Sequence, residues 1–154
     1  LEAPMDDTLL EQYSVLRRKL GQSILPAGYN IYSADFIRQG IEQHSWDAGR
    51  FDVTVIGGVS TALELMIIAN EAGLPIEIQS WGHALGQAAN LHLMLANEHT
   101  SYFEAPMPME AFEFGMKNVI PLKQGRVFAP KGPGLGIEVD WENLDRADFY
   151  VRSE

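Results

Sequence analysis

The sequence alternates short apolar, strand-like runs with helical patterns, and this alternation constrains the fold more than any other feature. The strand-like runs lie at 23–27, 52–56, 76–80 and 102–103, each preceded by a helical pattern, the last of which covers 82–97. Because short loops join these runs to the helices, neighbouring strands are expected to run parallel, as in βαβ units. The pattern therefore predicts an α/β fold, either a barrel or a doubly wound sheet.

Residues that typically cap helices stand at the expected boundaries. In a capping box, T-x-x-E before an apolar helical repeat, the Thr side chain accepts a hydrogen bond from a free backbone N–H group at the helix start. The pairs Thr8 with Glu11 and Thr61 with Glu64 match this pattern, and Ser33 is expected to cap the helix between them.

The two glycines Gly57-Gly58 follow an apolar run and open a helix, which raises the question of a phosphate-binding loop. They lack the G-x-G-x-x-G spacing of a dinucleotide site, and no G-x-x-x-x-G-K-[ST] occurs in the sequence. The alternating glycines at 132–136 lead into a strand-like run instead of a helix. A phosphate resting on the helix N-terminus after Gly58 stays a minor alternative.

The charge balance argues against several classes of partner. Eleven Lys and Arg stand against 21 Asp and Glu, giving a formal charge of −10, so we expect no nucleic-acid and no anionic-membrane surface. No Lys or Arg occurs between Arg50 and Lys117.

The absence of Cys excludes thiolate chemistry and disulfides. The apolar runs are too short to span a bilayer, and we expect a cytoplasmic protein.

One acidic or amide residue falls near the end of each expected strand. In a (β/α)₈ barrel, the carboxyl ends of the strands meet over a single site, so such residues gather there. The candidates are Glu2, Asn30, Asp52, Gln79 and Glu104.

The order of several motifs resembles that of a known family. The motifs are "EAP", "AGYN", "D-x-x-x-I-G-G-V", "LPIEIQSWG", "ANLHLMLA", "YFEAP" and "PKGPGLGIEVD". From Glu2 to about Asp140 the chain is similar to the C-terminal part of the enolase superfamily, mandelate racemase/muconate lactonizing type. The resemblance implies the C-terminal half of a (β/α)₈ TIM-type barrel with about four parallel strands over 1–104. Residues 105–154, rich in Pro and Gly, are then a C-terminal tail that wraps the same domain.

The resemblance also implies a Mg²⁺-dependent enzyme that removes a proton α to a carboxylate, of the acid-sugar dehydratase or racemase type. A hard divalent cation suits this chemistry because it neutralises the charge that develops on the carboxylate. The family pattern places Glu2 at the second metal ligand. It places Tyr29 where the third ligand, normally Glu, is expected, and Asn30 could supply a neutral oxygen in its place.

The remaining site positions follow from the same resemblance. Asp52 matches the residue that orients a catalytic His, but Gln79 falls where that His is expected. His83 could turn toward Asp52 and take its role. Glu104 matches the acid that hydrogen-bonds the substrate carboxylate or its enediolate form.

Parts of the family pattern precede this chain, namely the first metal ligand, a pair of lysines and an N-terminal capping domain. The chain alone is therefore expected to be inactive, and it is expected to pair with a second copy or with a complementary N-terminal half. A small hydroxy acid or sugar acid is the expected substrate. The alternative is a non-catalytic relative, or a truncated remnant that keeps the scaffold without activity.

Overall fold

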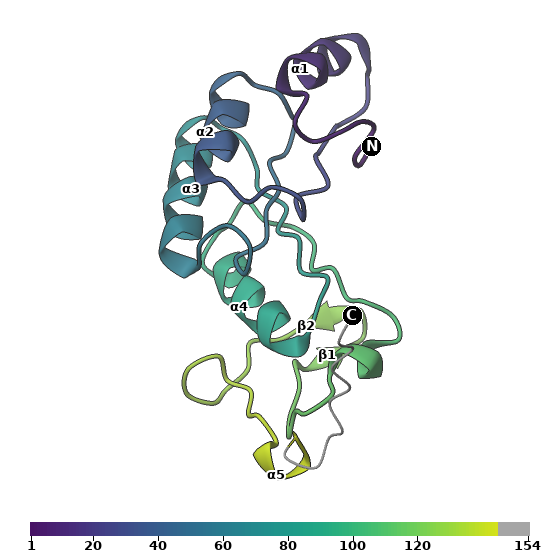
Figure 1. Ribbon diagram of the computed structural model, residues 1–154, viewed down its shortest axis with the longest axis vertical. Coiled ribbons are helices and arrows are strands. Elements are labelled where there is room, and N and C mark those ends of the chain that lie inside the picture. The colour runs from purple at the N-terminus through teal and green to yellow at the C-terminus, as the bar shows by residue number, and fades with distance from the viewer. Residues whose placement is uncertain (145–154) are drawn as a thin grey trace, which may run out of the picture.

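The computed structural model describes residues 1–144, and its main elements are four helices that alternate with extended segments. The helices are α1 (Leu10–Lys19), α2 (Ala34–Glu42), α3 (Val59–Glu71) and α4 (Ala84–Leu95). Figure 1 shows α2, α3 and α4 following one another along one side of the extended segments. In the described part of the chain, none of the helices has the length and apolarity needed to cross a bilayer.

The extended segments run parallel and are hydrogen-bonded in chain order. Parallel bridges join Glu2 to Leu25 and Gly49 to Ile76. Each of these two pairs of segments is joined by one isolated bridge and not by a longer ladder. The order is that of consecutive βαβ units, which confirms the predicted parallel arrangement. The backbone bonds that set the register are Ala3 N to Leu25 O (2.9 Å), Ala48 N to Ile24 O (3.4 Å), Glu77 N to Gly49 O (2.9 Å) and Gln79 N to Phe51 O (3.1 Å).

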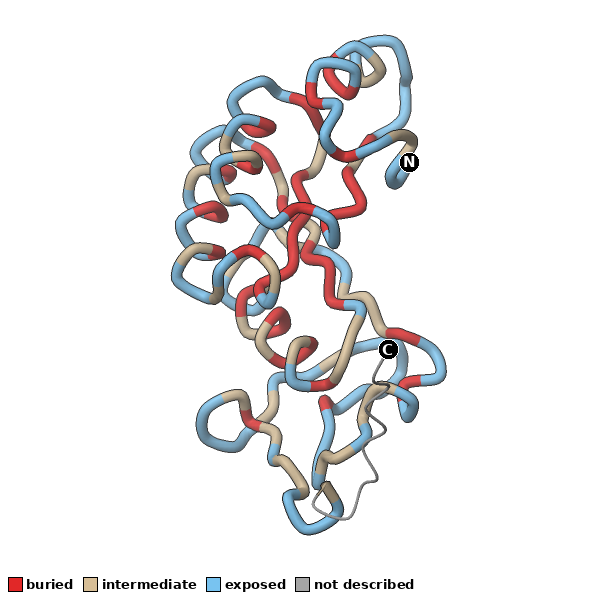
Figure 2. The backbone as a smooth tube through the Cα atoms, viewed as in Figure 1, coloured by how far each residue is buried: buried red, intermediate tan, exposed pale blue. Residues whose placement is uncertain are grey.

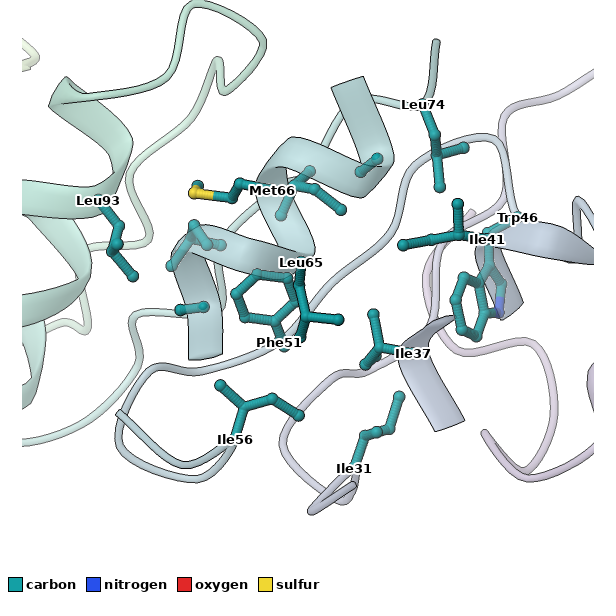
Figure 3. Packing of buried hydrophobic residues seen from close by; sticks show 14 of the residues in the cluster. Ile31, Ile37, Ile41, Trp46, Phe51, Ile56, Leu65, Met66, Leu74 and Leu93 are labelled. Atoms are coloured by element: carbon teal, nitrogen blue, oxygen red, sulfur yellow. The ribbon is translucent and has the colours of Figure 1, made fainter. Parts of the chain in front are cut away.

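The core lies between these segments and the helices. Figure 2 shows the buried stretches along the extended segments and on the helix faces turned toward them. Figure 3 shows Phe51, Leu65 and Met66 inside the main cluster, where Phe51 and Leu65 are fully buried. Ile37 and Ile41 of α2 and Trp46 after it belong to the same cluster. Burial of this shared apolar surface holds α2 and α3 on the segments.

The predicted strand at 52–56 is wrong. The carbonyl of Asp52 accepts hydrogen bonds from Val55 N (3.1 Å) and Ile56 N (3.0 Å), so the chain turns immediately after Asp52. The extended segment is the preceding one, which pairs through Gly49 and Phe51 and ends at Asp52. The apolar residues Val53 and Ile56 are buried as predicted, but they are buried by the turn.

Both predicted capping boxes are wrong, whereas the cap at Ser33 is confirmed. Ser33 Oγ accepts from Phe36 N (3.3 Å). α1 has Leu9 as its N-cap with no side-chain bond, and the hydroxyl of Thr8 instead donates to Asp6 Oδ1 (2.6 Å). α3 already begins at Val59, which leaves Thr61 inside its first turn. Thr8 is bonded to the Asp6 carboxylate, and α3 begins directly after Gly57-Gly58, so neither Thr stands at an N-cap.

The tail after Glu104 contains a few short elements. They are a 3₁₀ turn η1 (Met109–Phe112), the antiparallel pair β1 (Leu122–Lys123) and β2 (Arg126–Val127), and α5 (Trp141–Leu144). Ile120 packs with Ala88 and Leu91 of α4, so the tail covers that helix. The predicted domain division at 104/105 stays a prediction, and residues 145–154 of the predicted tail lie outside the described residues.

Gly40 of α2 provides a test of this packing. A Cβ atom at position 40 would lie 2.0 Å from the ring of the buried Trp46. We expect Gly40→Ala to lower the free energy of unfolding by about 2 kcal/mol through overpacking, although Ala is favoured over Gly inside a helix by about 1 kcal/mol. Urea denaturation of Gly40→Ala and of Gly21→Ala, where a Cβ meets nothing within 4 Å, measures the difference. An equal or greater stability of Gly40→Ala than of the unsubstituted chain would contradict the packing.

Candidate functional site

The site lies at the end of the segment that pairs through Gly49, where side chains alternate between two surroundings. Phe51 is fully buried in the core cluster, whereas its neighbours Arg50 and Asp52 have polar partners. This is the alternation expected of extended backbone, in which successive side chains leave on opposite sides. Arg50 and Asp52 therefore leave the segment on the side opposite to Phe51, and Asp52 at its end also meets Asn90 of α4.

Arg50 joins the first extended segment to the last one. Its Nη1 lies 3.0 Å from Glu2 Oε1, and its Nη2 is paired with Glu104 Oε1. The Arg50 side chain is only 5% exposed, while the side chains of Glu2 and Glu104 are 57% and 27% exposed. The buried Nε of Arg50 has no hydrogen-bond partner. One carboxylate from the first segment and one from the last thus hold the guanidinium. The edge formed by the carboxyl ends of the segments, which carries Glu2, Asp52 and Glu104, is the rim of the site.

The two contacts of Arg50 link the two outermost segments. Glu2 and Glu104 are four strand spacings apart in the order 2, 25, 49, 76, 104, which in a flat sheet is about 19 Å. An arc with Arg50 on its concave face shortens this distance between the backbones, so that the three side chains meet. An arc of parallel segments is the geometry of part of a barrel.

Asp52 is buried and its carboxylate is surrounded by neutral donors. Oδ1 accepts from Thr54 N and Thr54 Oγ1 (2.8 Å each) and from Asn90 Nδ2 (2.9 Å). The amide of Gln79 lies against Asp52 Oδ2 and Trp81 N. Assigned with its nitrogen toward Asp52, the amide donates to Oδ2 (3.1 Å) and its oxygen accepts from Trp81 N (3.3 Å). No titratable side chain takes part in this set of contacts.

Glu104 is held by the neighbouring segment as well as by Arg50. Its Oε2 accepts from Ser80 N (3.3 Å), and the Ser80 hydroxyl lies 3.0 Å from both the backbone O and the backbone N of Glu104. The Glu104 carboxylate is therefore fixed at the end of the last segment. Glu2, Asp52 and Glu104 all stand at the carboxyl ends of parallel segments, and Arg50 connects two of them.

A small cavity of about 220 Å³ lies over Asp52. His83 lines it together with Ser80, Trp81 and Asn90, so the structure brings two of the predicted catalytic residues, Asp52 and His83, to one cavity. Glu2, Asn30 and Glu104 do not line it.

His83 uses both ring nitrogens in structural contacts. It is the N-cap of α4, with Nδ1 accepting from Leu85 N (3.3 Å), and Nε2 lies 2.9 Å from the carbonyl oxygen of Phe114. These partners fit the neutral tautomer that carries its proton on Nε2. The ring also packs edge-on against Phe114, with centroids 4.6 Å apart. A catalytic role for His83 stays a prediction and requires the ring to leave the carbonyl of Phe114.

A larger cavity of about 640 Å³ contains Tyr29 and Asn30. Tyr29 is 54% exposed and so is available at its wall. Asp7 also lines this cavity, but its oxygens accept from Ala27 N (2.9 Å), Gly28 N (3.1 Å) and the hydroxyl of Tyr13 (3.2 Å). Burial, and next the Asp7 carboxylate, raise the pKa of Tyr13 above its usual range. Asp7 is thus engaged in holding the turn after the second segment.

The donor set of the described residues does not fit a Mg²⁺ ion as it stands. Mg²⁺ prefers octahedral oxygen ligands including carboxylates, but Glu2 is paired with Arg50, and Asn30 lines a cavity that Glu2 does not. Within residues 1–144, no three or more Asp, Glu or His side chains form a group that could hold a metal. A complete set would need further ligands, so the assignment of Glu2 and Asn30 as ligands stays a prediction.

Three residues of the site were not predicted from the sequence: Arg50, Asn90 and Ser80. Arg50 had a usable signal, because it stands two residues before Asp52 in an extended run and is the last cation before Lys117. Asn90, 1% exposed, looked like an ordinary residue of an apolar helix, yet it bonds both Asp52 and Val53 N (2.9 Å). Nothing in the sequence distinguishes Ser80 from other serines near strand ends.

Comparison with known proteins supports the barrel interpretation. Muconate cycloisomerase 1 of Rhodococcus opacus is 30% identical over 102 residues, which are 65% of this chain and 26% of that protein. A crystal structure of a candidate mandelate racemase/muconate lactonizing enzyme from Pseudovibrio sp. is 35% identical with a TM-score of 0.91, covering 97% of this chain and 40% of that one. A crystal structure of an enolase from alpha proteobacterium BAL199 with bound Mg is 22% identical, with a TM-score of 0.79. The match covers 94% of this chain and 38% of that one, and at this identity it supports a shared fold only.

The chain thus spans about a quarter of the muconate cycloisomerase and two fifths of the Pseudovibrio protein. The similarity confirms the fold class, the C-terminal half of a (β/α)₈ barrel, and the resemblance to the mandelate racemase/muconate lactonizing type. The sequence model of the enolase C-terminal domain-like family matches residues 1–143, and this chain belongs to that family.

Proposed function

We propose that this chain supplies the carboxyl-terminal half of the barrel of an enzyme that removes a proton α to the carboxylate of a small hydroxy acid or sugar acid. The observation that carries the proposal is the gathering of Glu2, Asp52 and Glu104 at the carboxyl ends of parallel segments in a chain of this family. In barrel enzymes the active site lies at that end of the strands.

The residues take the roles that the family resemblance implies. Glu104, fixed by Ser80 and Arg50, would in its acid form donate a hydrogen bond to the substrate carboxylate or its enediolate form. Asp52 would orient the group that accepts the proton. His83 is an imidazole that shares the cavity of Asp52, and an imidazole can accept a proton near neutral pH. Racemase and dehydratase chemistry both begin with this proton removal.

Mg²⁺ is the cofactor that the resemblance implies, and one fold relative contains bound Mg. A bound Mg²⁺ would stabilise negative charge on the substrate carboxylate. The described donor set does not fit the ion, so the role proposed for this chain is limited to its own side chains.

A partner is part of the proposal. The first segment pairs on one side with residue 25, and the last segment packs on one side against Ser80, so the arc has two open edges among the described residues. Parallel sheets are normally closed or covered, because open edges expose unpaired backbone groups. We therefore infer pairing with a second copy or with an N-terminal half. Sedimentation equilibrium of the chain at micromolar concentration is expected to show a dimer or larger species, and a monodisperse monomer with cooperative heat unfolding would contradict this.

Exchange of the α-proton with solvent tests the reaction directly. We expect a member of a panel of hydroxy acids and sugar acids to exchange its α-proton for deuterium in D₂O, followed by ¹H NMR. Asp52→Asn should slow this exchange by about 100-fold, because it disturbs the group that orients the proton acceptor. Asp35→Asn, at an exposed carboxylate paired with Arg38, is the matched control. The assay uses the 154-residue chain and the longest protein that its gene encodes, and equal exchange by both variants would rule the proposal out.

The contact between Asp52 and Gln79 favours the second candidate, a scaffold without activity. The Gln79 amide donates to Asp52 at the place where the resemblance expects a His, and an amide neither accepts nor releases a proton near neutral pH. A chain retained for its scaffold alone would then show no α-proton exchange with any acid of the panel.

Gln79→His separates the two candidates. If the remaining site is competent, an imidazole hydrogen-bonded to Asp52 should raise α-proton exchange by about 100-fold, the usual contribution of a positioned base. Gln43→His, at an exposed position after α2, is the control. A folded Gln79→His variant that still exchanges no acid of the panel would favour the scaffold.

A further inference from the structure

Arg50 is the single buried cationic side chain within residues 1–144. Burying a charge is unfavourable unless the charge is paired. Arg50 meets this requirement with two carboxylates, Glu2 and Glu104, and has no partner for Nε. The position of the guanidinium therefore depends on those two contacts.

The stem of Arg50 is fixed as well. A Cβ atom at Gly28 would lie 2.9 Å from Arg50 Cγ and 3.2 Å from the Arg50 backbone, and Gly28 has φ +84°. The space beside residue 28 is thus occupied by the Arg50 stem, and the backbone there adopts a conformation that favours glycine. The second segment, at Gly28, therefore packs directly against the stem of Arg50.

The Arg50 guanidinium occupies the position between Glu2 and Glu104 that a metal ion bound to both carboxylates would take. The guanidinium is planar, stays charged at any relevant pH and offers several donors in fixed directions, so one group can serve two carboxylates. The three groups together carry a formal charge of −1, since two carboxylates face one guanidinium. A metal ion that binds Glu2 and Glu104 together must compete with a cation already held by both.

We propose that Arg50 is the resident cation of this rim: its guanidinium links Glu2 to Glu104 and excludes a divalent metal ion from that pair. Arg50 is then a positioning residue that fixes both ends of the arc. This inference concerns cation binding alone and does not require that the chain catalyse the proposed reaction.

Binding of Mn²⁺, followed by electron paramagnetic resonance on the full 154-residue chain, tests the proposal. The unsubstituted chain is expected to show no saturable Mn²⁺ site below millimolar concentration. Arg50→Gln removes the competing cation, and should gain a site that binds Mn²⁺ at least tenfold more tightly. Arg38→Gln is the matched control, because Arg38 also contacts two carboxylates, Asp35 (2.7 Å) and Glu64 (3.3 Å), but on the surface. That variant should bind Mn²⁺ as the unsubstituted chain does.

Circular dichroism verifies that Arg50→Gln is folded, and a folded variant with no gain in Mn²⁺ affinity overturns the proposal. A second measurement needs no variant. Millimolar Mg²⁺ should leave the thermal midpoint of the unsubstituted chain unchanged, and a saturable rise in that midpoint also overturns the proposal. Either of these results leaves the proposed α-proton chemistry intact, whereas failure of the exchange assay leaves the role of Arg50 intact.

Discussion

The alternation of side chains at residues 50–52 links the core of this protein to its site. Phe51 is buried between the segments and the helices, and this burial fixes the faces on which its two neighbours lie. Arg50 and Asp52 are consequently placed on the concave face, one in contact with two acids and the other with neutral donors. A shift of one residue in this segment would bury a charge in the core and expose Phe51. The register of one short segment thus determines both the packing and the chemistry.

The scarcity of cations explains how the acidic rim is stabilised. No Lys or Arg occurs between Arg50 and Lys117, so most carboxylate oxygens of the rim must accept hydrogen bonds from neutral donors. Asp52 relies on hydroxyl, amide and backbone donors, and Glu104 uses the backbone N–H of Ser80 together with Arg50. Neutral donors stabilise a carboxylate without titrating themselves. The rim is therefore anionic, and its one buried counter-charge is shared between its two ends.

The sequence predicted the parallel order and the helices, because these follow from periodicity and short loops. The strand at 52–56 was placed wrongly, since the turn that begins at Asp52 buries Val53 and Ile56 as a strand would. The capping boxes failed because Thr8 bonds the Asp6 carboxylate and because α3 begins directly after Gly57-Gly58, two residues before Thr61. The contact of Arg50 with Glu2 and Glu104 spans most of the chain, and no local pattern reports a contact between residues so far apart.

Replacing Arg50 by a metal ion would change more than the charge of the rim. A guanidinium bridges two carboxylates through separate nitrogen atoms, so Glu2 and Glu104 need not approach each other. A Mg²⁺ ion binds its ligands at about 2.1 Å and in nearly octahedral directions. Two acids from the outermost segments would have to converge on one point, which requires a tighter arc or ligands from another part of a complete barrel. A metal ion held by the same pair, as expected in Arg50→Gln, would therefore draw the two outermost segments closer together than Arg50 does.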